Sequence, residues 1–177
     1  MTLNGATAVL VVPEAEAWVK ARMAARDTAH LVNAPSNPPG WSAGKLGEWY
    51  PDILGTDGKL TVATSKPYWQ PEWLAQHDRL LAAMAAMPDC VPLVITGDLH
   101  ATAEGRILAS GNADFSRRSV IAALPSAFGT SAGGWASDFR GVGPLVSNHL
   151  QMEEAVRPIE ENGFSLLDLT PEAITIR

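Results

Sequence analysis

The strongest structural constraint in this chain is the segment Val91–Thr96 (VPLVIT), a run of mostly apolar residues that ends at Gly97–His100 (GDLH). A short apolar run without polar alternation is typical of a strand that is covered on both faces. Val120–Leu124 (VIAAL) has the same character. Because helices usually cover such strands, the two runs predict an α/β fold.

Two helices are expected before the first of these strands. One begins at Pro13, a residue that suits the first helical position, and extends to about Ala25. The other covers Glu72–Met87 and ends before Pro88. Each has one apolar face at the spacing of a helix. These faces consist of Ala15, Trp18, Val19 and Met23 in the first helix, and of Trp73, His77, Leu80, Leu81 and Met84 in the second.

Further segments have strand character. Ala6–Val12 (ATAVLVV) predicts a buried strand, and His30–Asn33 and Leu60–Thr64 predict short ones. Phe164–Leu169 and Ala173–Arg177 predict a C-terminal hairpin, because a Thr-Pro-Glu turn separates them. Strands that alternate with helices and end in paired strands indicate a layered α/β sandwich with a mixed sheet. At 177 residues the chain, 1–177, is expected to be a single domain.

Composition excludes several classes of protein. Apolar residues make up 46% of the chain and charged residues 18%, which excludes a disordered tail. The formal charge of −6 argues against a nucleic-acid partner. No run approaches the ~20 apolar residues of a membrane span, and no signal peptide is recognisable near Met1. The one cysteine, Cys90, excludes an internal disulfide, is expected to be a buried thiol, and leaves the compartment open.

The loop Gly97–His100 carries the sharpest chemical pattern. In open α/β sheets, ligands collect at the carboxyl ends of strands, and this loop directly follows a predicted strand. Asp98 and His100 are two positions apart, so in extended backbone both side chains leave the same side. A carboxylate beside an imidazole is a common ligand pair for zinc, iron or manganese. The spacing fits equally well a turn-capping Asp98 and a hydrogen-bonded His100 at a sheet edge.

The order of three segments carries a resemblance to a known family. Pro35–Asp52 (PSNPPGWSAGKLGEWYPD), the helix Glu72–Met87 and then Val91–His100 (VPLVITGDLH) resemble the C-terminal part of PhoD-type alkaline phosphatases. These enzymes belong to the calcineurin-like metallophosphoesterases. The segment Gly163–Asp168 (GFSLLD) is similar as well.

The resemblance implies a fold, a reaction and two site residues. The implied fold is the C-terminal half of a four-layer αββα sandwich with two central sheets. The implied function is hydrolysis of a small phosphoester, by a phosphatase or phosphodiesterase, at a di-metal or multi-metal site. His100 is implied as a metal ligand and Asp98 as a second candidate ligand, with iron, zinc, manganese or calcium as the metal. The resemblance identifies no catalytic and no substrate-binding residue.

The chain also departs from the family. The earlier metal motifs, Asp-x-His, Gly-Asp and Gly-Asn-His-Asp or -Glu, are expected before Gly97 and are absent there. Gly111–Asp114 (GNAD) has the outline of the third, but alanine replaces its histidine. We therefore expect the chain to be the C-terminal portion of a metallophosphatase domain, with little activity by itself. Self-association through an unpaired edge at Ala6–Val12 is also expected. The alternative is a non-catalytic fragment or interaction module of the same fold.

A second enzyme class has one motif in the chain. Gly129–Gly133 (GTSAG) matches the Gly-x-Ser-x-Gly pattern of serine hydrolases around Ser131, and Asp138 and His149 follow in the order of that triad. The pattern requires a strand directly before the serine, and Pro125–Phe128 separates the motif from the preceding strand. A glycine-rich loop is the favoured interpretation, and a serine hydrolase that uses Ser131 is the lesser alternative.

Four smaller expectations concern the remaining loops and polar residues. Asn37–Tyr50 is expected to form an exposed loop, as a lid over the site or as an ordinary solvated loop. Asn33 is expected to cap a loop, and His77 to be a hydrogen-bonded core residue rather than a ligand. Candidates for the walls of a pocket are Trp41, Trp49 and Trp69.

Overall fold

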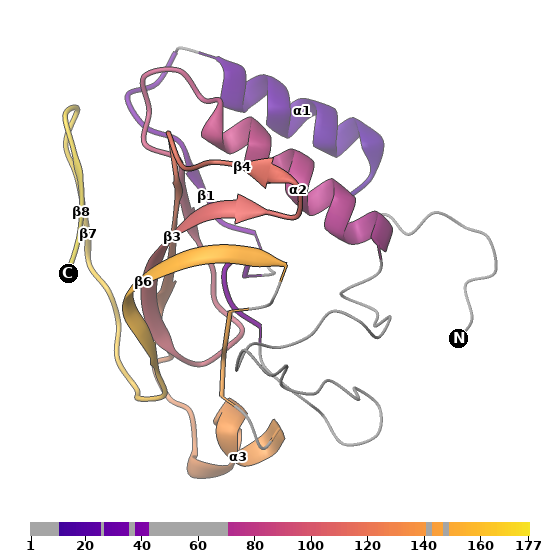
Figure 1. The fold of residues 1–177 in the computed structure, drawn as a ribbon. Coiled ribbons are helices and arrows are strands. Elements are labelled where there is room, and N and C mark those ends of the chain that lie inside the picture. The colour runs from indigo at the N-terminus through magenta and orange to yellow at the C-terminus, as the bar shows by residue number, and fades with distance from the viewer. Residues whose placement is uncertain (1–10, 26, 36–37, 43–70, 141–142, 147–148) are drawn as a thin grey trace.

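The computed structural model of the chain describes residues 11–25, 27–35, 38–42, 71–140, 143–146 and 149–177, with the backbone alone for 71–74, 139 and 140. In chain order the elements are α1 (Pro13–Ala24), β1 (Val32–Asn33), α2 (Pro71–Ala85), β2 (Leu93–Ile95), β3 (Thr102–Ser110), β4 (Ala113–Asp114), β5 (Val120–Pro125), a 3₁₀ turn (Ala132–Gly134), α3 (Ala136–Arg140), β6 (Leu150–Ile159), β7 (Leu167–Leu169) and β8 (Ile174–Ile176) (Figure 1). Elements α1, α2, β1, β2, β5 and the C-terminal hairpin agree with the predictions from the sequence.

Six of these strands form one mixed sheet. β1, β2 and β5 are parallel neighbours, and β3 runs antiparallel to β5 on one side and to β6 on the other. β4 continues β3 as a short hairpin. The α/β class with a mixed sheet is therefore confirmed. Because β6 has the same direction as β5, the carboxyl ends of β1, β2, β5 and β6 lie together, and we name this the carboxyl end of the sheet and the opposite one the amino end.

Helices α1 and α2 lie side by side and cover one face of the sheet (Figure 1). Met23 of α1 and Met84 of α2 join sheet residues such as Val94 and Ala122 in one hydrophobic core. Trp18, which helical spacing assigns to the apolar face of α1, is 67% exposed instead. The reason is that α1 packs mainly on α2, so that only a narrow stripe of α1 is buried, and Met23 of that stripe lies in the core.

Polar side chains join the two helices to each other. The Glu16 carboxylate accepts hydrogen bonds from Arg79 Nε and Nη2, both at 2.9 Å, and from Gln76 Nε2 at 2.7 Å. These bonds, that from Arg79 above all, lower the pKa of Glu16 to about 2. The Gln76 amide also bonds to the N–H and the C=O of Val11. Val11 and Val12 lie outside any strand, and the rest of the predicted strand Ala6–Val12 lies outside the described residues.

The two longest described strands, β3 and β6, are not predicted by the sequence. They pair along almost their full length, from Thr102 with Ile159 to Ser110 with Leu150. The pairing is close, since a Cβ on Gly105 would lie 2.7 Å from the backbone oxygen of Glu153. Both strands mix charged residues with apolar ones, so their sequences lack the apolar runs that mark β2 and β5.

The segment Gly111–Asp114, which has the outline of a metal motif, consists of the hairpin turn after β3 and the short strand β4. Gly111 has φ +55°, a left-handed conformation that glycine adopts without a steric penalty. The Asp114 carboxylate accepts a hydrogen bond from the Ser116 N–H at 2.8 Å, and this bond lowers the pKa of Asp114. The motif-like sequence is thus explained by turn chemistry.

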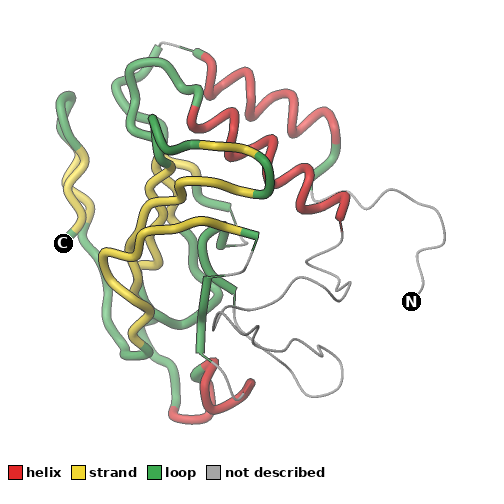
Figure 2. The backbone as a smooth tube through the Cα atoms, viewed as in Figure 1, coloured by secondary structure: helices red, strands yellow, loops and turns green. Residues whose placement is uncertain are grey.

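The strands β7 and β8 form a two-stranded antiparallel sheet on the side of the large sheet away from the helices (Figure 2). His30 Nε2 donates a hydrogen bond to the carbonyl oxygen of Thr170 in the hairpin turn at 2.5 Å. The described residues thus form a helix layer, a six-stranded mixed sheet and a separate two-stranded sheet.

The structure tests only some of the predictions about loops. Trp41, a candidate for a pocket wall in an exposed loop, is 3% exposed and donates from Nε1 to Glu154 Oε1 at 2.9 Å. Most of the segment Asn37–Tyr50, like Leu60–Thr64, Trp49 and Trp69, lies outside the described residues. Cys90, just before β2, is half-buried. In the described part of the chain, no helix is long and apolar enough to cross a membrane.

Candidate functional site

The loop after β2 lies at the carboxyl end of the sheet, as the sequence predicts. Its backbone is not extended, because Asp98 and His100 have φ values of +74° and +50°. Both side chains are exposed, while Leu99 between them is 4% exposed and packs in the core. The burial of Leu99, rather than the period of a strand, sets this arrangement. A Cβ on Gly97 would meet nothing within 4 Å, so the start of the loop is open.

Backbone strain collects at this end of the sheet. Four described residues other than glycine have positive φ, and three of them, Asp98, His100 and Ser126, directly follow β2 or β5. The left-handed conformation costs a residue with a Cβ about 1–2 kcal/mol. Strain of this kind persists where the surrounding structure enforces it, and it is concentrated at functional loops. The carboxyl end is therefore the first candidate for a site.

His100 is oriented by a loop that is distant in sequence. Its Nδ1 lies 2.8 Å from the carbonyl oxygen of Gly134. Because a carbonyl oxygen only accepts, Nδ1 carries the proton, and in the neutral ring the lone pair is on Nε2. Histidines that bind metals are commonly held in this way, with one ring nitrogen donating to a carbonyl and the other free to ligate.

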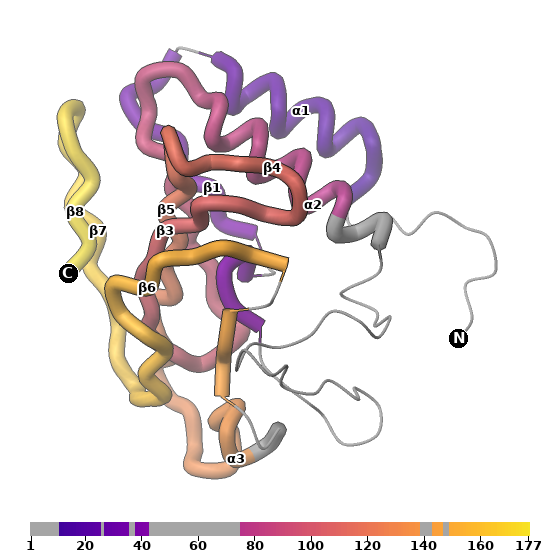
Figure 3. Tube along the Cα trace, in the orientation of Figure 1, coloured from indigo at the N-terminus to yellow at the C-terminus, as the bar shows by residue number. Residues whose placement is uncertain are grey.

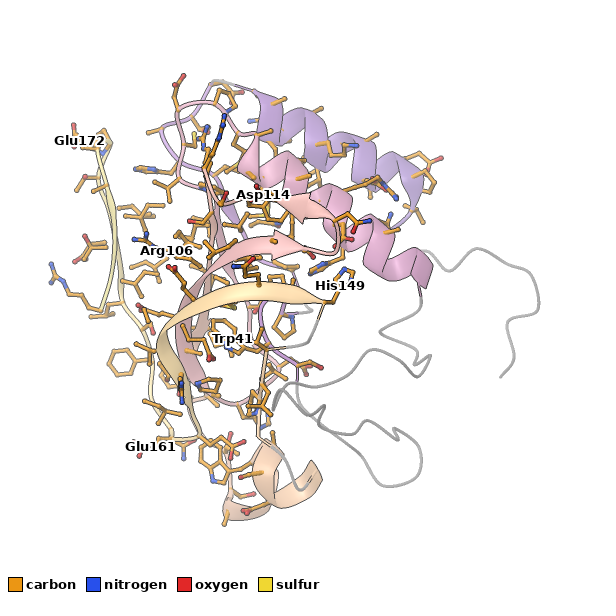
Figure 4. All side chains as sticks on the ribbon, in the orientation of Figure 1. Trp41, Arg106, Asp114, His149, Glu161 and Glu172 are labelled. Atoms are coloured by element: carbon orange, nitrogen blue, oxygen red, sulfur yellow. The ribbon has the colours of Figure 1, made fainter. Side chains whose placement is uncertain are left out.

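The loop after β5 contains the serine-hydrolase motif. Figure 3 traces the chain from β5 through this loop to α3. Ser131 is exposed and precedes the 3₁₀ turn Ala132–Gly134, so no strand leads directly into it and no α-helix follows directly. The third residue of that triad, His149, directly precedes the start of β6, and Glu161 follows the end of that strand (Figure 4). The ten residues of β6 span about 30 Å. The alternative of a serine hydrolase using Ser131, Asp138 and His149 is therefore wrong.

His149 instead belongs to a second polar cluster, at the amino end of the sheet. Its Nε2 donates to the two carboxylate oxygens of Asp78 at 3.0 and 3.1 Å. Ser110 Oγ donates to Asp78 Oδ1 at 2.5 Å. His77 Nδ1 lies 3.8 Å from the same oxygen, and in the described part of the chain this buried nitrogen has no hydrogen-bond partner. The prediction of a hydrogen-bonded core position for His77 is wrong for that nitrogen.

Electrostatics in this cluster favour a charged Asp78. Partial burial alone would raise its pKa, but the hydrogen bonds from His149 and Ser110 and the nearby His77 outweigh that effect and hold the pKa well below its ordinary value. The cluster connects α2 with the end of β3 and the start of β6. No local pattern in the sequence relates Asp78, Ser110 and His149, so sequence reasoning missed this cluster.

The described residues do not complete a metal centre. Among them, no group of three or more His, Cys, Asp or Glu side chains could hold a metal ion. His100 and Asp98 provide two donors at most, whereas protein metal sites commonly use three or four. Asn33, at the carboxyl end of β1, donates from Nδ2 to Met84 Sδ at 3.5 Å and packs toward α2.

Comparisons with known proteins give one partial match. No protein-family model matches the sequence, and no curated protein sequence matches it. A solved structure titled "Structure of PhoD" superposes on the chain with a TM-score of 0.49 and 13% sequence identity. The match covers 95% of this chain and 32% of that one, so the chain spans about a third of the length of the protein that it matches. The roles of individual residues rest on the geometry described above.

Proposed function

We propose that the loop Gly97–His100 supplies ligands to the site of a metal-dependent phosphoester hydrolase. His100 is the principal ligand through Nε2, and Asp98 is a second donor. The observation that carries the proposal is the hydrogen bond from His100 Nδ1 to the Gly134 carbonyl oxygen, because it leaves the Nε2 lone pair free on an exposed side chain.

Two further observations support this function. The sequence of the loop, and of the segments before it, resembles the PhoD-type alkaline phosphatases, which act on phosphoesters. The strained residues Asp98, His100 and Ser126 gather at the end of the sheet where α/β folds bind their ligands. Imidazole with carboxylate suits zinc, iron or manganese better than calcium, which prefers oxygen ligands alone. A complete centre requires further ligands, which the described residues do not contribute.

The test is a metal titration of the whole chain. Isothermal titration with Zn²⁺ or Mn²⁺ should detect one site, and His100→Ala should weaken it by about tenfold or more. Asp98→Ala should weaken it to a smaller degree. Glu172→Ala, in the exposed turn of the hairpin, is the matched control and should leave the affinity unchanged.

Activity is measured in parallel with an aryl phosphate ester and the same metals. Metal-dependent turnover that disappears in His100→Ala supports a hydrolase. Equal metal affinities of the wild type and His100→Ala would overturn the proposal. That result would favour a non-catalytic module of the same fold.

A further inference from the structure

The segment that follows β6 holds the loop that carries Gly134. Ser126 Oγ donates to the Glu161 carbonyl oxygen at 2.7 Å, and the Gly163 N–H donates to the Ala127 carbonyl oxygen at 2.9 Å. A parallel bridge pairs Ala127 with Asn162. Glu161 lies in this segment, past the end of β6 (Figure 4). The beginning of the loop after β5 is thus fixed by hydrogen bonds to the backbone of this segment.

Asn162 fixes the middle of the same loop through its side chain. The Thr130 N–H donates to Asn162 Oδ1 at 2.6 Å, and Asn162 Nδ2 donates to the Thr130 carbonyl oxygen at 3.1 Å. This pair of bonds satisfies both backbone polar groups of Thr130, in the way that a neighbouring strand would. An amide is required for this, because it offers a donor and an acceptor together.

Glu160 fixes the end of the loop. Its carboxylate accepts from the Ser137 N–H at 2.9 Å and from the Ser137 hydroxyl. Gly134 therefore lies between two held positions, Thr130 and Ser137. A further bond, from the Gly134 N–H to the Ser131 carbonyl oxygen at 2.8 Å, closes the turn between them.

We infer that Asn162 and Glu160 are positioning residues for His100. They hold the Gly134 carbonyl oxygen in place, and that oxygen selects the ring form of His100 in which Nδ1 carries the proton and Nε2 has the lone pair. The inference concerns the protein without metal and does not require that His100 be a ligand. The two side chains act on His100 through the loop that carries Gly134. Glu160 and Asn162 lie 26 and 28 positions after Gly134 in the sequence, so no local pattern reveals their role.

The experiment observes the His100 ring directly. Long-range proton–nitrogen NMR of the ¹⁵N-histidine-labelled chain, without metal and at a pH where the ring is neutral, reports which nitrogen is protonated. In the wild type the Nδ1–H form should dominate. In Asn162→Ala and in Glu160→Ala the Nε2–H form should gain about threefold or more in relative population, as expected when one hydrogen bond weakens.

A matched control comes from the same segment. Glu161→Ala keeps the backbone oxygen that Ser126 uses, so it should leave the His100 ring form unchanged. Asn162→Asp keeps the acceptor for the Thr130 N–H and loses the donor, so it should give an intermediate population and provides a milder variant if Asn162→Ala does not fold.

The outcomes separate this inference from a purely structural role and from the proposed function. Variants that melt at a lower temperature with an unchanged His100 ring form would overturn the inference. A changed ring form supports it. A changed ring form with unchanged Zn²⁺ affinity supports it as well, and contradicts only the assignment of His100 as a metal ligand.

Discussion

The two ends of the sheet each present a histidine, and the two histidines are held differently. At the amino end, His149 donates to the carboxylate of Asp78, and the two side chains are 18% and 23% exposed. At the carboxyl end, His100 donates to a backbone carbonyl and is exposed. Every described polar contact of His149 serves to join elements, whereas the described contact of His100 uses Nδ1 and does not use Nε2.

The amino end shows how contacts between elements perturb the pKa of a carboxyl group. The pKa of Asp78 is held far below its ordinary value, yet the bonds responsible connect α2 to β3 and β6. Perturbed groups occur in structural ion pairs as well as in active sites. At the carboxyl end the distinguishing features are exposure, positive φ and a histidine oriented by a carbonyl.

The largest change in stability is expected from substituting Gly111, at the amino end of the sheet. A Cβ on Gly111 would lie 2.8 Å from Asp78 Oδ2 and 3.0 Å from His149 Cε1, at φ +55°. Backbone strain and displacement of the pair should together lower the free energy of unfolding of Gly111→Ala by about 2–3 kcal/mol. Urea denaturation measures this loss.

Gly97→Ala is the matched variant at the other end. A Cβ there would meet nothing within 4 Å, so the free energy of unfolding should change by no more than about 0.5 kcal/mol. Equal losses in the two variants would remove the contrast between a packed amino end and an open carboxyl end.

The histidines themselves give the next largest effect. His149→Ala leaves the partly buried carboxylate of Asp78 with fewer donors, so the free energy of unfolding should fall by about 1–2 kcal/mol. His100→Ala should change it by less than about 0.5 kcal/mol, since the side chain is exposed. In the Zn²⁺ titration the order should reverse, with His149→Ala close to the wild type. A large loss of stability in His100→Ala would show that its contact with Gly134 is structural.

The smallest expected effect is on how the free energy of unfolding depends on pH in acid. The pKa of Asp78 is lower in the folded chain than its ordinary value of 3.8, so its charge stabilises the fold above about pH 4, and this stabilisation is lost as the pH falls. One such carboxyl contributes at most about 1.4 kcal/mol per pH unit. Asp78→Asn and His149→Ala should both flatten the acid limb of stability against pH, followed by urea denaturation between about pH 2.5 and 7. An unchanged acid slope in both would mean that other carboxyls govern acid unfolding.

The predictable part of the fold consists of segments whose own residues carry a pattern. The apolar runs of β2 and β5, and Pro13 with the helical spacing of α1 and α2, were sufficient to locate these elements. β3 and β6 escaped prediction because residues such as Glu104, Arg106 and Glu153 interrupt their apolar positions. A strand of that composition is stable because it pairs on both sides, as β3 does, and pairing is invisible in one segment.

The candidate site also has a part that the sequence predicts and a part that it does not. The sequence by itself determined that Asp98 and His100 follow a buried strand, because an apolar run and the polar loop after it are adjacent in the chain. Only the tertiary structure decided that Gly134 orients His100, across 34 positions, and that His149 pairs with Asp78, across 71 positions. Those contacts depend on how the strands and helices pack, and a hydrogen bond between distant residues leaves no periodic trace in the sequence from which it could be predicted.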